Sequence, residues 1–335
     1  MVRTVFAPCL VSLLIASLTL PLFRRLANRF DILDYPSSPL KRHEHPIPYL
    51  GGAAVFAGLL AGILVYPGVW PTELIGLLCG TTVMFFVGFA DDLKPLSPYS
   101  KFGLQLLATT LAILGDLHVS IAAFPPALNY FLTYLWVMAI TNAFNIIDVH
   151  DGLCSGTAVF VSVGLLLVSI FTTLYDKTFV TVSAAAMAGA AAAFFAVNRP
   201  PAKMFLGDAG SLTIGFLLSG LAIGESYTPD HLVGLLVPFI LFLVPIYDLI
   251  FVVIVRLAKG KSPIRGSPDH VAIRLRRLGW NDHRVLWSIL SLSAAAAILC
   301  PGVVFLPLPY ATFLAACAVL ACIGIGIVLA GVKTE

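Results

Sequence analysis

The sequence predicts an all-α protein that crosses a membrane about 11 times (10–11), as a single integral-membrane domain over residues 1–335. Of its residues, 59% are hydrophobic and only 11% are charged, and the mean hydropathy is +0.97. A water-soluble domain of this length cannot bury so much apolar surface, because much of any monomer's exterior faces water. The composition therefore excludes an ordinary soluble enzyme and also a disordered chain.

Apolar segments of roughly the length needed to cross a bilayer recur along the chain, and we expect each to form one membrane-spanning helix. We interpret the first as a retained helix, because no small-residue cleavage site follows it. The segment 211–224 is short, and we expect it to include residues from the preceding Gly-Asp-Ala-Gly. In chain order the expected spans are 4–23, 49–70, 72–90, 103–123, 127–144, 153–174, 179–197, 211–224, 232–256, 285–306 and 310–331.

Basic residues divide the connecting loops into two sets. All of the 20 Lys and Arg residues except Arg3 and Lys177 follow odd-numbered spans. Cytoplasmic loops carry the excess of Lys and Arg, so this bias predicts an external N-terminus and a cytoplasmic C-terminus. The polar loops, which we expect to form an active site facing the cytoplasm, are 24–48, 91–102, 145–152, 198–210 and 257–284. Together with the lack of a targeting segment, the bias predicts the inner (cytoplasmic) membrane of a prokaryote.

Most of the acidic residues lie in the same loops, several of them where an apolar segment ends. Carboxylates hold divalent cations and Lys or Arg side chains bind phosphates, so this mixture favours an anionic, metal-bound substrate. Asp91 and Asp92 close the third span, where two adjacent carboxylates repel each other unless a metal or a proton relieves them. The alternative is a solvated helix end that pairs with Lys94.

The segment after the fifth span is rich in side-chain oxygens. Asn142, Asn145 and Asp148 recur every three residues and would line one side of a helix, and Asp151-Gly152 ends the stretch. Oxygen ligands at this density suit Mg²⁺ or Mn²⁺. The alternative is that these residues only cap two helices, a role that Asn and Asp favour.

Two further loops carry candidate binding residues. Asp208 lies between Gly207 and Gly210 at the start of a span, where we expect free backbone N–H groups to receive a phosphate. The longest loop, 257–284, contains His270 and Arg274. The alternatives for this loop are that its basic residues attract anionic lipid headgroups and that His270 is an ordinary polar residue.

These five loops, in this order and over residues 34–284, resemble the polyprenyl-phosphate N-acetylhexosamine-1-phosphate transferases. That family includes the enzymes that start O-antigen and teichoic-acid linkage synthesis and the phospho-MurNAc-pentapeptide transferase. The motifs that carry the resemblance are Lys41-x-His43 with Pro46-x-Pro48 and Gly51-Gly52, Asp91-Asp92 with Ser97 and Lys101-x-x-x-Gln105, Asn142-x-x-Asn145-x-x-Asp148-x-x-Asp151-Gly152, Phe205-x-Gly207-Asp208-x-Gly210-Ser211, and the Lys/Ser/Pro loop that ends at His270.

The resemblance implies that a polyprenyl (undecaprenyl) phosphate attacks the β-phosphorus of a UDP-N-acetylhexosamine and releases UMP, with Mg²⁺ (or Mn²⁺) as cofactor. The implied metal ligands are Asn145 and Asp208, and the implied catalytic residues are Asp91, Asp92, Asp148 and Asp151. Phe205 would stack on uracil and Lys101 would contact phosphate. The implied substrate-binding residues are Lys41, His43, Lys101, Asn142, Phe205, Gly207, His270 and Arg274.

The implied partners are the nucleotide sugar, the lipid phosphate and membrane lipid, with a homodimer left open and no nucleic acid. Val149-His150 separates the two acids where family members commonly have Gly-Leu or Gly-Ile, and the last loop keeps one histidine where members often have two or three. The missing histidines favour the branch that acts on UDP-GlcNAc or a related UDP-sugar over the pentapeptide transferases. The transferase hypothesis requires that Asn145, Asp92 and Asp208 converge at one lipid–water boundary around a divalent cation.

Three other function classes compete. A transporter or flippase for a lipid-linked or nucleotide sugar should place polar residues near mid-membrane, often with internal repeats. Only Asp116 and Asp248 lie clearly within apolar runs, and no repeat is visible. An inactive membrane scaffold would not need acids at every site, and the D-x-x-D-G-x-x-A-R pattern of CDP-alcohol phosphotransferases is missing.

Overall fold

The computed structural model describes residues 2–36, 45–66, 68–172, 178–225, 232–262, 267–332 and 334. Within these ranges the chain is almost entirely helical, which confirms the predicted all-α class. The one strand pair described is antiparallel, β1 (Leu33–Asp34) with β2 (Ile47–Pro48), and lies in the chain between the first two α-helices. The helices up to the centre of the chain are α1 (Ala7–Arg29, after a short π-helix Val2–Phe6), α2 (Gly51–Ile63), α3 (Thr72–Leu93), α4 (Pro98–Leu114), α5 (Pro126–Ile147), α6 (Leu153–Thr172), α7 (Thr178–Asn198) and α8 (Gly207–Gly224).

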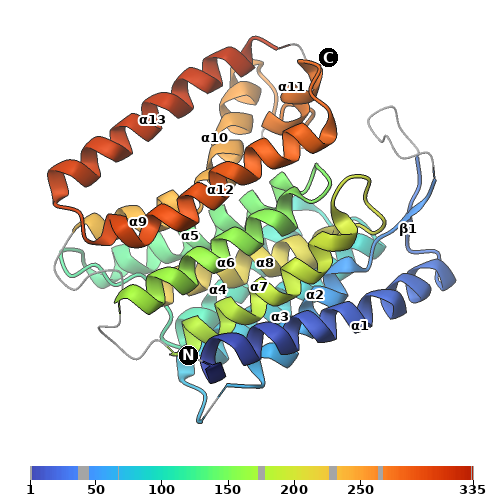
Figure 1. Ribbon diagram of the computed structural model, residues 1–335, viewed down its shortest axis with the longest axis horizontal. Helices are drawn as coiled ribbons and strands as arrows, with labels where there is room; N and C mark the ends of the chain where they lie inside the picture. The colour runs from blue at the N-terminus through green and yellow to red at the C-terminus, as the bar shows by residue number, and fades with distance from the viewer. Residues whose placement is uncertain are drawn as a thin grey trace.

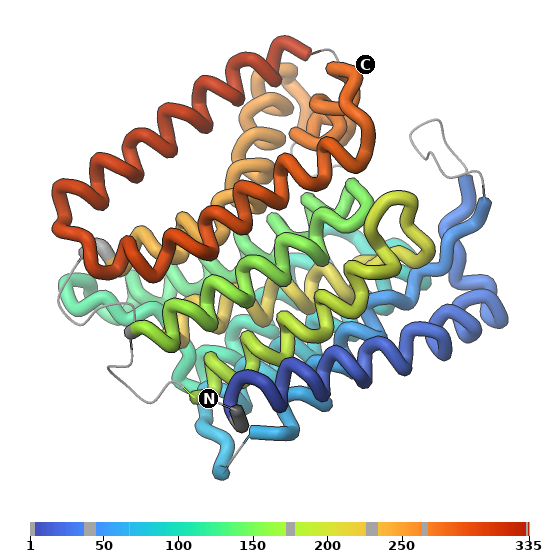
Figure 2. The backbone as a smooth tube through the Cα atoms, in the orientation of Figure 1, coloured from blue at the N-terminus to red at the C-terminus, as the bar shows by residue number. Residues whose placement is uncertain are grey.

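The remaining helices are η2 (Leu232–Leu235), α9 (Leu236–Leu241), α10 (Leu243–Ala258), α11 (Val271–Arg277), α12 (Asp282–Val304) and α13 (Leu308–Ala330). Figure 1 shows α1 to α8 side by side as a bundle, with α13 on its outside and the two termini at opposite ends. The two strands between α1 and α2 and the connections α5–α6 and α7–α8 lie at the same end of the bundle as α11 (Figure 2). This is the common end that the alternation of polar and apolar loops predicts.

Eight helices in the described part of the chain are long and apolar enough to cross a membrane: α1 (together with the residues from Thr4), α3, α5, α6, α7, α8, α12 and α13. Each of the other three expected spans, 49–70, 103–123 and 232–256, contains shorter helices. α2 has 13 residues and α4 has 17. The protein is therefore a polytopic membrane protein, while the count of eleven crossings stays a prediction.

Local chemistry explains two of these shorter helices. α4 begins earlier than expected, because the Ser97 Oγ accepts the Ser100 N–H at 3.0 Å and caps the helix. It ends at Leu114, before Gly115 and Asp116, and the φ of Asp116 is 68°. The expected span 232–256 is divided at Phe242, between α9 and α10. Pro245 has no N–H to donate to the Leu241 carbonyl, so one continuous helix cannot pass this point without losing a hydrogen bond.

Helix α8 lies at the centre of the bundle. The share of its span that is buried is 89%, against 22% for α1 and 6% for α13. It packs against α2, α3 and α5, and to a lesser extent against α6 and α7. A helix that is apolar all round must be surrounded by protein or lipid, and in α8 protein supplies nearly all of the cover. The first turn of α8, which carries Asp208, is therefore held by several neighbours.

Glycines allow the backbones of α2 and α3 to approach α8. A Cβ placed on Gly52 of α2 would meet the backbone N of Gly210 at 2.3 Å, and one on Gly88 of α3 would meet the backbone O of Asp208 at 2.2 Å. Real Cβ atoms do not approach backbone atoms so closely, so neither helix could carry a larger residue here without moving. Glycine at these positions is what brings the three helices together around Asp208.

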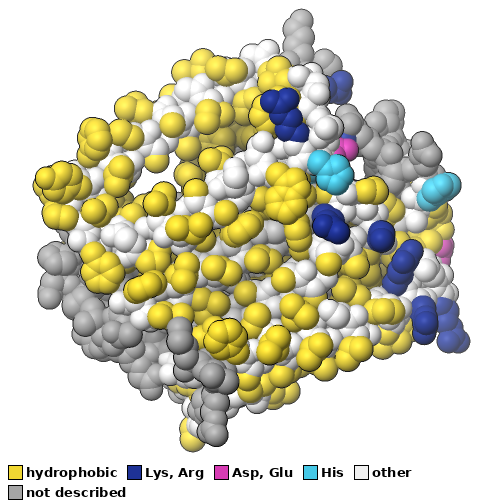
Figure 3. Space-filling view, viewed as in Figure 1, with side chains coloured by type: hydrophobic (Ala, Val, Ile, Leu, Met, Phe, Trp, Pro, Cys, Tyr) yellow, Lys and Arg dark blue, Asp and Glu magenta, His cyan; other side chains and the backbone are white. Residues whose placement is uncertain are grey.

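Side chains of different kinds occupy different parts of the surface. Hydrophobic side chains cover most of the face in Figure 3, and Lys, Arg and His side chains gather at the end where the polar connections lie. Such a division matches a bundle with its long sides in lipid and one basic end in water. The compartment that this end faces, the cytoplasm, is predicted from the Lys and Arg bias alone.

Replacing Gly52 tests the packing of α2 on α8. We expect Gly52→Ala to lower the unfolding free energy by about 1–3 kcal/mol, because the new methyl group overlaps the Gly210 backbone. Gly103→Ala is the matched control, since a Cβ at this helical glycine meets nothing within 4 Å. Apparent Tm in detergent should fall for the first variant and stay constant or rise for the second. Equal Tm values for Gly52→Ala and Gly103→Ala would contradict the close packing of α2 on α8.

Candidate active site

Five side chains from four helices meet at the start of α8, and we call them the acid cluster. Asp91 and Asp92 come from the last turn of α3, and Lys101 comes from the first turn of α4. Asn145 comes from the last turn of α5 and Asp208 from the first turn of α8. The convergence of Asp92, Asn145 and Asp208 that the sequence analysis requires is therefore present.

Lys101 bridges two carboxylates of the acid cluster. Its Nζ lies 2.6 Å from Asp91 Oδ2 and 2.7 Å from Asp208 Oδ2, so the lysine relieves the repulsion between them. The other oxygen of Asp208 accepts a hydrogen bond from Asn145 Nδ2 at 2.9 Å, and the same Nδ2 donates to Ser211 Oγ at 3.0 Å. Asp91 thus pairs with Lys101 and not with Lys94, the neighbour considered from the sequence.

Asp92 has a role that the sequence analysis missed. Its Oδ1 accepts the backbone N–H of Asp208 at 2.7 Å, and its Oδ2 accepts that of Ala209 at 3.1 Å. A carboxylate from α3 therefore caps the N-terminus of α8, where free N–H groups and the helix dipole favour negative charge. This corrects the expectation that these N–H groups wait for a substrate phosphate.

Gly207 makes this contact possible. Its φ is +72°, a conformation that L side chains rarely adopt, and a Cβ here would lie 2.5 Å from Asp92 Oδ2. We expected Gly207 to bind substrate. The structure shows instead that only glycine leaves room at this position for the Asp92 carboxylate. A glycine directly before an acidic residue at a helix start indicates that another group packs closely there. The sequence could not identify that group as the Asp92 carboxylate.

A buried asparagine joins the loop after α5 to the loop after α7. Asn198 Oδ1 accepts the Gly152 N–H at 3.0 Å and the Ser155 hydroxyl at 3.1 Å, while its Nδ2 donates to the Met204 carbonyl at 3.0 Å. Asp151 connects the same two loops, because its Oδ2 accepts the Ala202 N–H at 2.9 Å. Asn198 was not among the predicted site residues; its only sequence signal was an Asn at the end of a span.

Asp148 and Asp151 lie in a crowded acidic environment. Burial raises the pKa of Asp148 well above its usual value, and the nearby charges of Asp208, Asp92 and Asp151 raise this pKa further. Burial also raises the pKa of Asp151, although the Ala202 N–H acts in the opposite direction. This region therefore favours any added positive charge, from a proton or a metal cation.

Two other predicted residues lie beside the acid cluster. Asn142 pairs with Gln105 of α4, since its Nδ2 lies 2.8 Å from Gln105 Oε1, and so it fixes α5 against α4. The Phe205 ring lies 5.9 Å from the Tyr49 ring, centroid to centroid, and is half-buried. The backbone of Phe205 also extends the short strand region, with its N–H donating to the Pro48 carbonyl at 2.8 Å.

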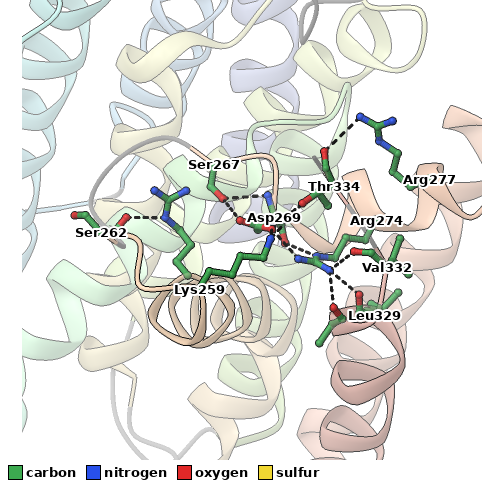
Figure 4. Close-up of polar contacts among 11 residues, drawn as sticks. Lys259, Ser262, Ser267, Asp269, Arg274, Arg277, Leu329, Val332 and Thr334 are labelled. Atoms are coloured by element: carbon green, nitrogen blue, oxygen red, sulfur yellow. Dashed lines mark hydrogen bonds and ion pairs between the residues drawn. The ribbon is translucent and has the colours of Figure 1, made fainter.

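His270 and Arg274 belong to a second polar network, formed where α10, α11 and the end of α13 meet. Arg274 is completely buried: it donates to both the backbone and the carboxylate of Asp269 and to the carbonyls of Leu329, Ala330 and Val332. Figure 4 shows this guanidinium turned toward Asp269 and the end of α13. The structure thus uses Arg274 to hold the C-terminal helix, and its donors are not presented to a substrate as expected.

The predicted binding residues Lys41 and His43 lie outside the described residues. Of the expected binding loops, the structure therefore brings together those of 91–102, 145–152 and 198–210.

The acid cluster fits the magnesium ion implied by the resemblance. No group of three or more His, Cys, Asp and Glu suited to a metal occurs in the described ranges. Mg²⁺, however, is usually held by one or two carboxylates together with water and substrate phosphates. Asn145 lies beside Asp208 with its amide nitrogen toward the carboxylate, so its Oδ1 would have to turn into the site to bind a metal. The Lys101 ammonium already occupies a cation position between Asp91 and Asp208.

Comparisons with known proteins support one family. The model of glycosyl transferase family 4 matches residues 74–225. A probable undecaprenyl-phosphate N-acetylglucosaminyl 1-phosphate transferase of Bacillus subtilis (strain 168) is 32% identical over 295 residues, covering 85% of this chain and 80% of the relative. The chain belongs to the polyprenyl-phosphate N-acetylhexosamine-1-phosphate transferases.

Two further relatives in this transferase family are similar over most of the chain. The decaprenyl-phosphate N-acetylglucosaminephosphotransferase of Mycobacterium tuberculosis (strain ATCC 25618 / H37Rv) is 30% identical, with 82% of this chain and 78% of the relative covered. The undecaprenyl-phosphate alpha-N-acetylglucosaminyl 1-phosphate transferase of Escherichia coli (strain K12) is 27% identical, with 81% of this chain and 76% of the relative covered. The family match at 74–225 includes every member of the acid cluster and stops before His270.

Gly207→Ala tests the cap that Asp92 provides in this transferase. We expect the variant to lose thermal stability and most of its sugar-phosphate transfer, because the methyl group would displace the Asp92 carboxylate from α8. Gly260→Ala is the control: its φ is +67°, but a Cβ there meets nothing within 4 Å. Both variants carry the backbone strain, so an equal loss in the two would contradict a specific contact between Gly207 and Asp92.

The raised pKa of Asp148 predicts a pH-dependent stability. Below the pKa of the unfolded chain, about 4, the carboxyl is neutral in both states, and as pH rises toward the folded pKa the folded state loses stability. Asp148→Asn should therefore raise the apparent Tm by a few degrees at pH 7 in EDTA, with the gain vanishing toward pH 4.

Asp269→Asn provides the opposite control for that experiment. Burial alone would raise the pKa of Asp269, but hydrogen bonds from Lys259, Ser267 and Thr334 hold this pKa well below its usual value. The ionised carboxylate therefore stabilises the fold above the unfolded pKa, and this stability is lost as pH falls through the folded pKa. Asp269→Asn should lower the Tm at pH 7. A higher Tm at pH 7 in both variants would contradict the opposite pKa shifts of Asp148 and Asp269.

Proposed function

We propose that this protein transfers N-acetylglucosamine-1-phosphate from UDP-N-acetylglucosamine to undecaprenyl phosphate and releases UMP. A lipid-phosphate oxygen attacks the β-phosphorus of the nucleotide sugar, a new P–O bond forms, and the bond from the β-phosphorus to the bridging oxygen breaks. That oxygen leaves with UMP, and the lipid carries a diphosphate-linked sugar. The names of the three relatives support this choice, because each describes an N-acetylglucosamine phosphate transfer to a polyprenyl phosphate.

The observation that carries the proposal is the acid cluster at the start of the buried helix α8. Phosphoryl transfer requires mainly positioning and charge neutralisation. Lys101, held between Asp91 and Asp208, offers an ammonium to a phosphate oxygen. Asp208 and Asn145 would hold Mg²⁺, which when bound neutralises the charge of the diphosphate. Asp92 keeps Asp208 in place through the backbone of α8.

The position of the acid cluster also supports a lipid-linked acceptor. A polyprenyl chain stays in the bilayer, so its phosphate reaches the protein only where spanning helices end. Asp91 and Asp92 lie in the last turn of α3, and Asp208 lies in the first turn of α8, both of them candidate membrane spans. A transporter needs its polar residues near mid-membrane, whereas this cluster lies at helix ends.

The proposal places the reaction at the inner (cytoplasmic) membrane, with the acid cluster facing the cytoplasm, where it would begin a cell-envelope glycan. The excess of Lys and Arg in the loops on that side supports the orientation. UDP-sugars carry negative charge, and these basic residues would raise their local concentration at the site.

A transfer assay tests the proposal directly. Purified protein in lipid nanodiscs, supplied with undecaprenyl phosphate, Mg²⁺ and radiolabelled UDP-N-acetylglucosamine, should yield butanol-soluble label and an equal amount of UMP. UDP-N-acetylgalactosamine and UDP-glucose tested in parallel measure the choice of sugar. Label confined to the aqueous phase with every sugar would overturn the proposed reaction.

Asp208→Asn tests the proposed metal ligand within that assay. We expect at least about a hundredfold loss of turnover, because changes even to groups around metal ligands cost 10–100-fold. EDTA should abolish the wild-type activity, and added Mg²⁺ should restore it. Asp116→Asn, at an exposed acid outside the acid cluster, should retain activity. Full turnover by Asp208→Asn would contradict the metal assignment.

A further inference from the structure

Asp248 is a buried acid that neither the family motifs nor the acid cluster explains. It lies on α10, in an otherwise apolar stretch, and is 6% exposed. Its Oδ2 lies 2.8 Å from Nδ1 of His270, and its Oδ1 accepts the Val271 N–H at 2.8 Å. Burying a carboxylate is costly, and a buried polar pair seldom stabilises a fold more than apolar residues would. The pair therefore calls for a functional explanation.

The two contacts of Asp248 determine which nitrogen of His270 carries a proton. An ionised carboxylate only accepts hydrogen bonds, so the Nδ1 that faces it must carry hydrogen. The second oxygen is engaged by the first N–H of α11, which fixes the carboxylate in one orientation. The Nε2 atom makes no hydrogen bond with any described residue, and it lies on the opposite side of the ring from Asp248.

The backbone on either side of His270 is also fixed. The preceding residue, Asp269, is completely buried and binds Lys259 at 2.6 Å, Thr334 at 2.9 Å and Arg274 at 2.7 Å. Figure 4 shows Lys259, Arg274 and Thr334 converging on Asp269 from α10, α11 and the C-terminal end of the chain. His270 is itself 4% exposed. The imidazole is thus held by its ring, by Val271 after it and by Asp269 before it.

We propose that Asp248 is a positioning residue that holds His270 with the proton on Nδ1 and so leaves Nε2 as the ring nitrogen that engages the nucleotide sugar. This inference rests on the proposed function and on the substrate-binding role that the family resemblance implies for His270, and it assigns to Asp248 a part in that reaction. A carboxylate behind a functional histidine sets the tautomer and orientation of the ring, and its removal typically costs 10–100-fold in activity.

Nitrogen-15 NMR of the histidine rings tests the tautomer without reference to activity. In protein with labelled histidines in nanodiscs, the signals missing from His270→Gln belong to His270, and we expect them to show a proton on Nδ1. In Asp248→Asn the amide oxygen must serve the Val271 N–H, so the amide nitrogen donates to Nδ1 and moves the proton to Nε2. Asp116→Asn, a control at an exposed acid outside both polar networks, should leave the His270 signals of the Nδ1–H form.

Two NMR results would overturn the inference. One is a wild-type His270 with the proton on Nε2 alone, and the other is an unchanged tautomer in Asp248→Asn. If Asp248→Asn fails to fold, the wild-type spectrum still decides, because the inference requires hydrogen on Nδ1. If the wild-type protein shows no transfer, the proposed function fails, while the same spectra still test the pairing of Asp248 with His270.

A double-mutant comparison tests whether Asp248 acts through His270. We expect Asp248→Asn to reduce kcat/KM about 10–100-fold. His270→Gln should remove the benefit of Asp248, so the double variant should be no slower than His270→Gln alone. Losses that multiply in the double variant would show that Asp248 acts elsewhere and would overturn the positioning role. Asp248→Glu, which keeps the carboxylate, should recover part of the activity.

Discussion

The contact between the Asp92 carboxylate and the N-terminus of α8 organises the site. Two oxygens from the end of α3 accept the N–H groups of Asp208 and Ala209, the second and third residues of α8, which follow Asp92 by 116 and 117 positions in the chain. The contact satisfies donors that would otherwise be buried without partners, and it places a negative charge at the positive end of the helix dipole. Once α3 and α8 are joined in this way, Asp91 and Asp208 must lie next to each other.

That proximity creates the chemistry of the site. Two carboxylates at the boundary of an apolar bundle repel each other, and Lys101 and Asn145 each engage one oxygen of Asp208 to relieve the strain. The same crowding extends to Asp148, whose pKa is raised. A site with this excess of acceptors favours cations, and it becomes neutral only when a cation or several donors arrive.

A separate network governs the C-terminal part of the protein. Asp269 and Arg274 fasten the end of α13 to α11, although only 6% of the α13 span is buried. A helix with so little apolar contact to the bundle cannot be placed by packing alone. Its carbonyl end is instead held by a buried guanidinium, which suits the negative end of the helix dipole. Asp269, the residue before His270, is thereby held by both α11 and the C-terminal end of the chain.

The sequence by itself determined the membrane class, the alternation of polar and apolar connections and the membership of Asp91, Asp92, Asn145 and Asp208 in one site. These follow from composition, from the length of apolar runs and from short motifs, all of which are local properties. It did not foretell that α2 and α4 would be short helices or that Pro245 would interrupt the expected span 232–256, because helix boundaries depend on caps and individual prolines.

Only the tertiary structure decided what each polar side chain faces. Asp92 could have met a lipid phosphate, Lys94 or a metal, and the close approach of α3 to α8 across Gly88 and Gly207 assigned it to backbone N–H groups. Arg274 could have met substrate, and the return of α13 buried it instead. Asp248 and Asn198 carried no motif at all. Their partners lie in other segments, and contacts between distant segments depend on how the helices pack in three dimensions.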